Sequence, residues 1–434
     1  MAEKEKKKGK GKKALKIIII IVAVLVLAYL VCTLINIAGD KGNEKLAASV
    51  EPVKYDSQLI PEKDEDGDWC FTADRDFKTV QLTDIHIGAG FLSFAKDSSA
   101  ITTVATMLKA EKPDLVIITG DIAYPIPFQS GTINNLRGAK IFAALMEQLG
   151  VYWTLGYGNH DTEAYSMFTR EQITDFYLNY PHCLLLAGPE DIDGVGNQII
   201  KIKNSDGIIT QAMVILDSHS YTDGDYFGAQ WKYDNIHENQ ITWYKNRIEA
   251  MNEQNTSAIK ALGKEKTKEY KDLETVKSLL FFHIPLTEYK DAWNELAENN
   301  FEDTEDVKYV TGLVGETGKQ IYCGIKDDNL FETILELGST KAVFCGHDHF
   351  NYFTVNYKGI DLSYGYSVDY LAYIGINKKG SQRGCTVITT TPDGKYNAEK
   401  FNLYQSGRYD IPAGFADDIG FQFESVTYQV NPEK

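Results

Sequence analysis

Three short apolar segments recur along the first half of this chain at nearly equal intervals, and their spacing constrains the fold more than any other feature. They begin at Lys78, Asp114 and Val151, so 36 and 37 residues separate the successive starts. Two stretches with a helical apolar pattern, 99–112 and 135–149, lie between them. This alternation predicts βαβ units with parallel strands. The second segment is almost continuously apolar, which is typical of a strand covered on both faces.

The second half of the chain repeats this pattern less regularly. Residues 198–217 predict a β-hairpin, and 277–282 and 341–345 predict short apolar strands. Residues 352–364 and 384–404 also have the pattern of hairpins. The sequence therefore predicts an α/β fold in which two mixed β-sheets form a sandwich flanked by helices.

The N-terminus has the features of a membrane anchor. Residues 1–16 contain eight Lys, and the next 19 residues, 17–35, contain no charge, Pro or Gly. Such a run is about long enough to cross a ~30 Å hydrocarbon core as a helix. A cleaved signal peptide is the alternative, but its apolar region is typically about 7–15 residues long. We therefore expect a single-pass protein of the cell membrane, with its N-terminus in the cytoplasm and the rest of the chain extracytoplasmic.

Composition divides the chain into four parts. We expect a basic cytoplasmic tail at 1–16, a transmembrane anchor at 17–38, a polar stalk at 39–70, and a folded domain with a C-terminal extension at 71–434. The stalk is expected because residues 39–70 are polar and show no apolar period.

The charge of the chain is unevenly distributed. Lys and Arg number 44 and Asp and Glu number 61, which gives a formal net charge of −17. Residues 1–16 alone carry a net +6, so the rest of the chain carries −23. Nucleic-acid binders neutralise phosphates with clustered Lys and Arg, so we expect no nucleic-acid binding. An anionic substrate would need positive charge from another source, such as metal ions.

Polar residues stand where the apolar strands end. In open α/β sheets the loops at the carboxyl ends of the strands converge on the ligand crevice, so we expect these residues to lie together. Five of the eight His in the chain belong to this set. Imidazole and carboxylate ligands suit Mn, Fe or Zn. The set comprises Asp84, His86, Asp121, Asn159, His160, Asp161, His283, His347 and His349.

The order of these motifs resembles the signature of the calcineurin-like metallophosphoesterases. The motifs D-x-H, G-D, G-N-H-D, H and G-H-x-H follow one another within residues 78–350. The segments G-D-I-A-Y at 120–124 and G-N-H-D-T-E at 158–163 resemble the branch related to purple acid phosphatases, found in fungal and plant phosphatases and in bacterial relatives. The resemblance implies that 71–434 is a metallophosphoesterase domain.

The resemblance also implies a site for two divalent or trivalent metal ions (Mn, Fe or Zn). In it, one carboxylate is shared by both ions, and it offsets their mutual repulsion. Two ions ~3.5–4 Å apart can clamp the phosphoryl oxygens, and a hydroxide that bridges the ions is the implied nucleophile. The implied ligands are Asp84, His86, Asp121 and His349 for the first ion, and Asp121, Asn159, His283 and His347 for the second.

Four further residues beside these ligands have expected roles. In the family, the residue that matches His160 lies beside the leaving-group oxygen, and we expect Asp161 to hold its other ring nitrogen. Asp348 is expected to point away from the site. Purple acid phosphatases use a Tyr that matches Tyr124 as an iron ligand, whereas calcineurin-like relatives use a His that matches His86. We favour His86 as the ligand, with Tyr124 lining the pocket or hydrogen-bonding nearby.

The predicted function is hydrolysis of a phosphomonoester by in-line attack of the bridging hydroxide. The expected partner is a phosphorylated small molecule or another phosphoester substrate. A phosphodiesterase or nucleotide hydrolase that uses the same ions is the nearest alternative. A non-catalytic binding module is disfavoured, because every implied ligand position and His160 are filled.

Overall fold

Two mixed β-sheets pack face to face in the computed structural model, which describes residues 2–222 and 224–412. The larger sheet contains, in spatial order, β1 (Glu62–Lys63), β2 (Trp69–Thr72), β6 (Gln198–Lys203), β7 (Ile209–Ile215), β8 (Ser278–Phe281), β10 (Thr340–Cys345), β12 (Ile360–Tyr364), β11 (Thr354–Tyr357) and β9 (Val307–Thr311). The smaller sheet contains β14 (Tyr396–Asn402), β13 (Gly384–Thr390), β3 (Phe77–Leu82), β4 (Leu115–Thr119) and β5 (Trp153–Gly156).

Parallel strands form the centre of each sheet. β3, β4 and β5 are parallel to one another, and so are β7, β8, β10 and β12. Antiparallel strands complete the sheets, among them the hairpins β6–β7 and β13–β14. One hydrophobic core fills the space between the sheets, with Phe77 and Ile117 from one sheet and Phe281 and Phe344 from the other. The predicted sandwich of two mixed sheets is confirmed.

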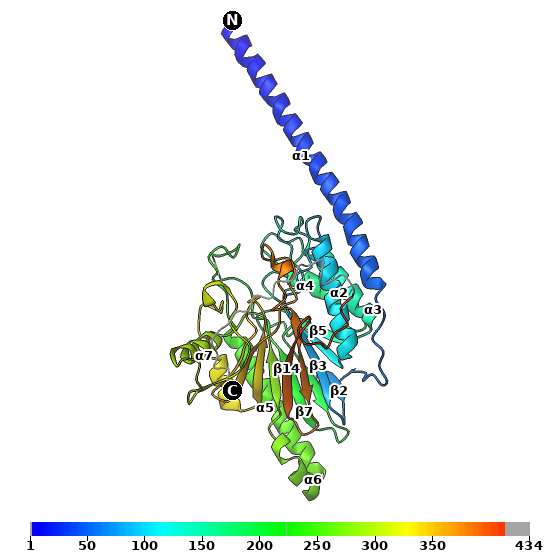
Figure 1. Cartoon of the computed structure of the whole chain (residues 1–434), viewed down its shortest axis with the longest axis vertical. Coiled ribbons are helices and arrows are strands. Elements are labelled where there is room, and N and C mark those ends of the chain that lie inside the picture. Colours follow the sequence, from blue (N-terminus) through cyan, green and yellow to red (C-terminus); the bar gives the residue numbers. More distant parts are fainter. Residues whose placement is uncertain (1, 223, 413–434) are drawn as a thin grey trace.

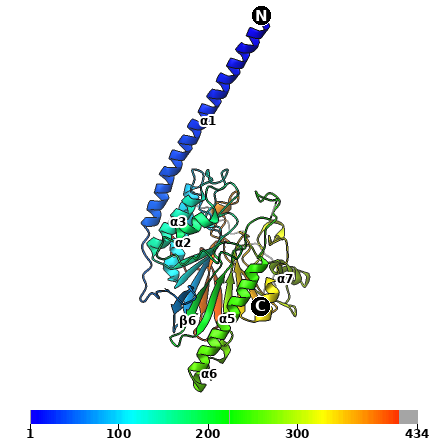
Figure 2. The same cartoon turned by 180° about the vertical axis from the view of Figure 1, so that it is seen from behind.

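Helices cover the outer face of each sheet (Figures 1 and 2). The smaller sheet is covered by α2 (Phe94–Glu111), α3 (Asn135–Leu149) and α4 (Arg170–Tyr177). The larger sheet is covered by α5 (Glu238–Ala261), α7 (Thr287–Glu298) and α8 (Leu330–Leu337). The remaining short helices are α6 (Lys264–Glu269) and the 3₁₀ turns η1 (Lys271–Leu273), η2 (Thr317–Lys319) and η3 (Ile376–Lys378).

Helix α3 shows how the local sequence sets an element. Its apolar residues repeat at helical spacing, and Ile141, Leu145 and Met146 on its inner face are fully buried. Gly150 ends the helix in the left-handed conformation (φ 67°), and its N–H donates to the carbonyl of Met146. Glycine is favoured at this position because it has no Cβ to clash.

Helix α1 (Ala2–Ala48) projects from the domain as one long rod (Figure 1). Within the part of the chain that the structure describes, it is the one helix long and apolar enough to cross a membrane.

Residues 39–48, expected to begin a polar stalk, instead continue α1. This part of the helix packs on the domain: Asn43 donates to the carbonyl of Phe94 (3.2 Å), and Ala47 is fully buried. A Cβ on Gly39 would lie 2.0 Å from the Phe94 ring, so only glycine allows this approach. The contact uses small and polar residues, and for this reason the stretch shows no apolar period.

Strand β1 also falls inside the expected stalk. Residues 413–434 of the expected C-terminal extension lie outside the described residues.

Candidate metal centre

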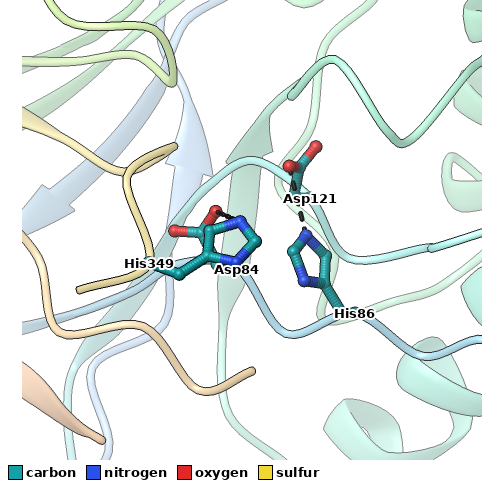
Figure 3. Close-up of side chains that lie close together, drawn as sticks. All are labelled: Asp84, His86, Asp121 and His349. Carbon is teal, nitrogen blue, oxygen red and sulfur yellow. Dashed lines mark hydrogen bonds and ion pairs between the residues drawn. The ribbon is translucent and has the colours of Figure 1, made fainter. Parts of the chain in front are cut away.

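The loops that follow five strands meet at one end of the sandwich. Asp84 and His86 follow β3, Asp121 follows β4, and His349 follows β10; Figure 3 shows these four side chains turned toward one another. Each offers one ligand atom, and these four atoms all lie within 4.8 Å of one another. All four side chains are almost completely buried. The remaining expected ligands Asn159, His283 and His347 come from the loops after β5, β8 and β10.

Four of these residues adopt the left-handed backbone conformation, which is unusual for residues other than glycine. The φ angles of Asp84, His86, Asp121 and His347 are 51°, 53°, 58° and 78°. Such backbone strain costs of order 1–3 kcal/mol per residue and clusters at functional sites. Gly158 allows the loops to approach closely, because a Cβ there would lie 2.1 Å from Oδ1 of Asp121.

Asp121 lies between two groups of histidines. Its Oδ2 is 3.2 Å from Nε2 of His86 and 3.1 Å from Nε2 of His283. Its other oxygen accepts the backbone N–H of His160 (2.8 Å). Although burial favours a neutral carboxyl, the positive charges of His283 and His160 hold the pKa of Asp121 well below its usual range.

The second group surrounds His283. Its Nδ1 donates to the carbonyl of Thr119 (2.8 Å), so Nε2 is the nitrogen that faces Asp121 and the cluster. Nε2 lies 3.1 Å from Oδ1 of Asn159 and 3.3 Å from Nδ1 of His347. Burial disfavours the charged ring, but the charge of Asp121 outweighs it and raises the pKa of His283 to about 9.

The donor set fits metal ions. Oδ1 of Asp84 and Nε2 of His347 are buried and have no hydrogen-bond partner among the described residues. Burial and the neighbouring charge of His283 hold the pKa of His347 well below its usual range, so this ring is neutral and can donate a lone pair. Buried imidazoles, carboxylates and an amide that converge in this way suit Mn, Fe or Zn.

The buried carboxylate of Asp369 holds two of these histidines. Its Oδ1 is 3.1 Å from Nδ1 of His86, and its Oδ2 is 3.0 Å from Nδ1 of His349. A carboxylate in this place keeps the proton on Nδ1 and directs Nε2 of both rings toward the cluster. The backbone N–H groups of Leu371 and Ala372 in turn donate to the carboxylate (2.6 and 3.0 Å). No motif in the sequence indicates this residue, which lies in a loop without an apolar period.

His160 contacts a different carboxylate from the expected one. Its Nδ1 lies 2.6 Å from Oε1 of Glu163, a pair within the G-N-H-D-T-E segment. Asp161 instead accepts the backbone N–H groups of Asp121, Ala123 and Gly158 at 2.9–3.0 Å. The expected contact between Asp161 and His160 is therefore wrong, because the Asp161 side chain turns back to join the loops after β4 and β5.

Tyr124 and Asp348 lie beside the cluster without facing it. The Tyr124 hydroxyl donates to Oε1 of Gln129 (2.9 Å), while its ring packs 4.6 Å from the His86 ring. Burial and the charge of Asp369 raise the pKa of Tyr124 well above its usual value, so the hydroxyl keeps its proton. As expected, Asp348 points away: its Oδ2 accepts hydrogen bonds from the Tyr364 hydroxyl (2.6 Å) and from Asn351 (2.9 Å).

A cavity of about 620 Å³ lies over the cluster, and His160, His347 and His349 form part of its wall. Aromatic side chains form much of the rest. The Tyr233 ring lies 4.2 Å from the His347 ring, and the Tyr221 hydroxyl accepts a hydrogen bond from Asn159 (2.9 Å). Apart from the histidines, the one basic residue among the described residues of this wall is Lys379.

This chain is similar to several known proteins. Residues 77–351 match the family model of calcineurin-like phosphoesterases. Two Arabidopsis thaliana proteins named probable inactive purple acid phosphatase 14 and 29 are each 28% identical to this chain. They align with 70% and 76% of it, and with 73% and 82% of their own lengths. Phosphatase DCR2 of Saccharomyces cerevisiae is 29% identical over 69% of this chain and 47% of its own length.

A solved dimetal phosphatase from Danio rerio aligns with 76% of this chain and 97% of its own, with 12% identity and a TM-score of 0.46. The family model spans more than half of the chain, and its motifs converge on one buried cluster of metal-binding side chains. The chain therefore belongs to the calcineurin-like phosphoesterases, which are metal-dependent hydrolases of phosphoesters.

Proposed function

We propose that this chain is a two-metal phosphomonoesterase in which Asp121 is shared by both ions. The observation that carries the proposal is the position of Asp121 Oδ2, almost equally distant from Nε2 of His86 and of His283. In this position one carboxylate oxygen could contact two neighbouring cations, each held by one of the two imidazoles. Asp84, His86 and His349 would complete the first site, and Asn159, His283 and His347 the second.

The residues around the ions would supply the rest of the chemistry. Two bound cations would offset the charge of the phosphoryl group and would lower the pKa of the attacking water. His160 lines the cavity, and Glu163 holds its Nδ1, so Nε2 is the nitrogen that can donate a proton to the leaving oxygen. Asp161 acts by holding the backbone of the loops that carry Asp121 and Asn159.

We also propose that the protein is a single-pass protein of the cell membrane with its domain outside the cytoplasm. Residues 1–16, which precede the apolar run, contain eight Lys and would stay in the cytoplasm. Protease added to intact cells should then remove the domain and leave a cytoplasmic marker intact. A domain that resists the protease until the cells are opened would contradict this orientation.

The hydrolase is tested with the full-length protein in detergent, loaded separately with Mn, Fe or Zn. Metal analysis should give two ions per chain, and turnover should be fastest on phosphomonoesters. Bis-nitrophenyl phosphate serves as the diester substrate. A protein that holds two ions but hydrolyses the diester faster would favour the phosphodiesterase, and one that holds two ions and hydrolyses neither class would contradict the proposal.

A further inference from the structure

Helix α1 joins the apolar run to the domain without a break. Asn36 is the first residue after the run 17–35, and it already contacts the domain. Its Nδ2 donates to the carbonyl of Gly131 (3.3 Å), and its Oδ1 accepts the N–H of Phe91 (2.8 Å). A flexible tether would let the domain move away from the membrane, whereas this continuous helix holds it at the end of the span.

The length of the run sets the depth of these contacts. Nineteen helical residues rise ~28 Å, which is close to the ~30 Å thickness of the hydrocarbon core. Asn36 therefore lies where the acyl chains meet the headgroups. Phe91 and Gly131 bond directly to Asn36, so their loops lie at the same depth. Each headgroup region is about 5–7 Å thick, and side chains that project from these loops reach it.

Large apolar side chains project from the domain around this contact. Phe128 is 92% exposed, Leu92 is 47% exposed, Phe91 is 39% exposed, and Ile374 is fully exposed. The N–H of Leu92 donates to the carbonyl of Ser130 (3.1 Å), which joins its loop to the one that carries Phe128. We call Phe91, Leu92, Phe128 and Ile374 the apolar rim. Adjacent exposed apolar groups mark surfaces that contact a partner or a membrane.

The cavity over the metal centre opens beside this rim. Ile126 and Gln129, which flank Phe128 in the chain, form one wall of the cavity, and Ile374 forms another. The Gln129 side chain donates to the carbonyl of Ala372, so the two walls are joined. Figure 1 shows the orange η3 segment, which follows Ile374, at the end of the domain that faces the N-terminal part of α1.

We infer that the apolar rim rests in the headgroup region of the membrane and that the substrate is a phosphate monoester carried on a membrane lipid. This inference rests on the proposed function of the metal centre. A lipid headgroup can enter the cavity from the bilayer while its acyl chains stay among the other lipids. Water then adds to phosphorus, the bond between phosphorus and the lipid oxygen breaks, and the products are inorganic phosphate and the lipid alcohol, which takes up a proton.

Photo-crosslinking tests the membrane contact without any activity measurement. Full-length protein with p-benzoylphenylalanine in place of Phe128 is placed in phosphatidylcholine vesicles, illuminated and searched for lipid adducts. Ile60 is the matched control: it is 71% exposed, and the nearby Gln58 donates to Gly150, which precedes β5 and so lies at the other end of the strands from the site. We expect adducts at position 128 and none at position 60. Absence of adducts at 128, or equal adducts at both, would overturn the membrane contact.

Turnover tests the substrate class. Wild-type protein in phosphatidylcholine vesicles is given dioleoyl phosphatidic acid within the same vesicles, glycerol phosphate or nitrophenyl phosphate. Phosphatidic acid should be hydrolysed faster than glycerol phosphate. Leu92→Asp and Phe128→Asp should each lower the ratio of phosphatidic acid turnover to nitrophenyl phosphate turnover about tenfold or more, and Ile60→Asp should not change it.

The outcomes separate this inference from the proposed function. A protein that holds two ions and hydrolyses the soluble esters but not phosphatidic acid would overturn the lipid substrate and leave the phosphomonoesterase intact. A protein that holds two ions and hydrolyses none of the three esters would overturn both. In each case the crosslinking result still decides whether the rim contacts lipid.

Discussion

Asp369→Asn should weaken one metal site and spare the other. The Asp369 carboxylate is fully buried and contacts Nδ1 of His86 with one oxygen and Nδ1 of His349 with the other. The oxygen that faces His86 also accepts the N–H of Leu371 (2.6 Å) and the shorter of two bonds from the N–H of Ala372 (3.0 Å, against 3.3 Å to the other oxygen). These donors will keep the amide oxygen of Asn on that side, so the new NH₂ group must face the N–H of His349. The NH₂ group of Asn and the Nδ1–H of His349 are both donors, so the hydrogen bond between positions 369 and 349 is lost.

The size of the effect follows from the number of histidines affected. Loss of a hydrogen-bonding partner behind one metal-binding His typically costs about 10–100-fold in metal affinity, or about 1.4–2.7 kcal/mol. Asp369→Asn leaves His349 without its acceptor, so we expect this range for the first ion. Asp369→Ala removes the support of His86 as well and should cost more. The ligands of the second ion, among them His283, do not contact Asp369 and should keep their affinity.

The assay is a titration of the full-length protein with Mn against a metal chelator, with metal content and turnover measured at each step. Wild-type protein should hold two ions at a free Mn concentration at which Asp369→Asn holds one, and excess Mn should restore both. Asp114→Asn is the matched control, because it also removes a buried carboxylate, which Arg75 holds far from the site. Equal affinity for both ions in Asp369→Asn and wild type would refute the reasoning.

Four further substitutions test the neighbouring residues. Asp121→Asn removes the charge that both ions would share, so metal analysis should show loss of more than one ion per chain; two retained ions with near-normal turnover would contradict sharing. His160→Gln should keep both ions but slow hydrolysis of an alkyl phosphate by about 10²–10⁴-fold, and that of nitrophenyl phosphate much less, because nitrophenolate hardly needs a proton. Glu163→Gln should give the same pattern in milder form, and equal losses on both substrates would argue against proton donation. Tyr124→Phe should leave metal content and visible absorption unchanged, since its hydroxyl bonds to Gln129; a lost absorption band would show an iron–tyrosinate bond.

The sequence predicts those helices and strands whose apolar residues repeat at a regular spacing. Helix α3 was predicted over its full observed length, because its buried residues repeat at helical spacing and Gly150 ends it. Helix α7 was not predicted, although Tyr289, Ala292, Trp293 and Leu296 repeat with the same spacing and are buried.

The site residues came together because each follows a strand of a sheet whose parallel strands end at the same edge. That topological rule needs only the strands and the polar residue after each one. It gives no information on what lies behind a ligand. Asp369 stands 20 positions beyond the last motif residue, His349, and reaches the cluster through a loop that no periodic pattern describes. Glu163 was visible in its motif, but the choice between it and Asp161 depends on which way the loop turns.

Polar contacts that leave no periodic pattern also explain why a helix stands at residues 39–48, where a stalk is expected. Here the consequence for function is larger. Asn36, Gly39 and Asn43 attach the helix to the domain through hydrogen bonds to backbone groups and through one close approach. Contacts of this kind leave no apolar period, so a stretch that makes them looks like a solvated stalk. A stalk would place the metal centre at a variable distance from the bilayer, whereas a helix fixed to the domain sets both its distance and its orientation. The proposed contact of the cavity rim with lipid therefore depends on a few polar residues that the apolar pattern ignores.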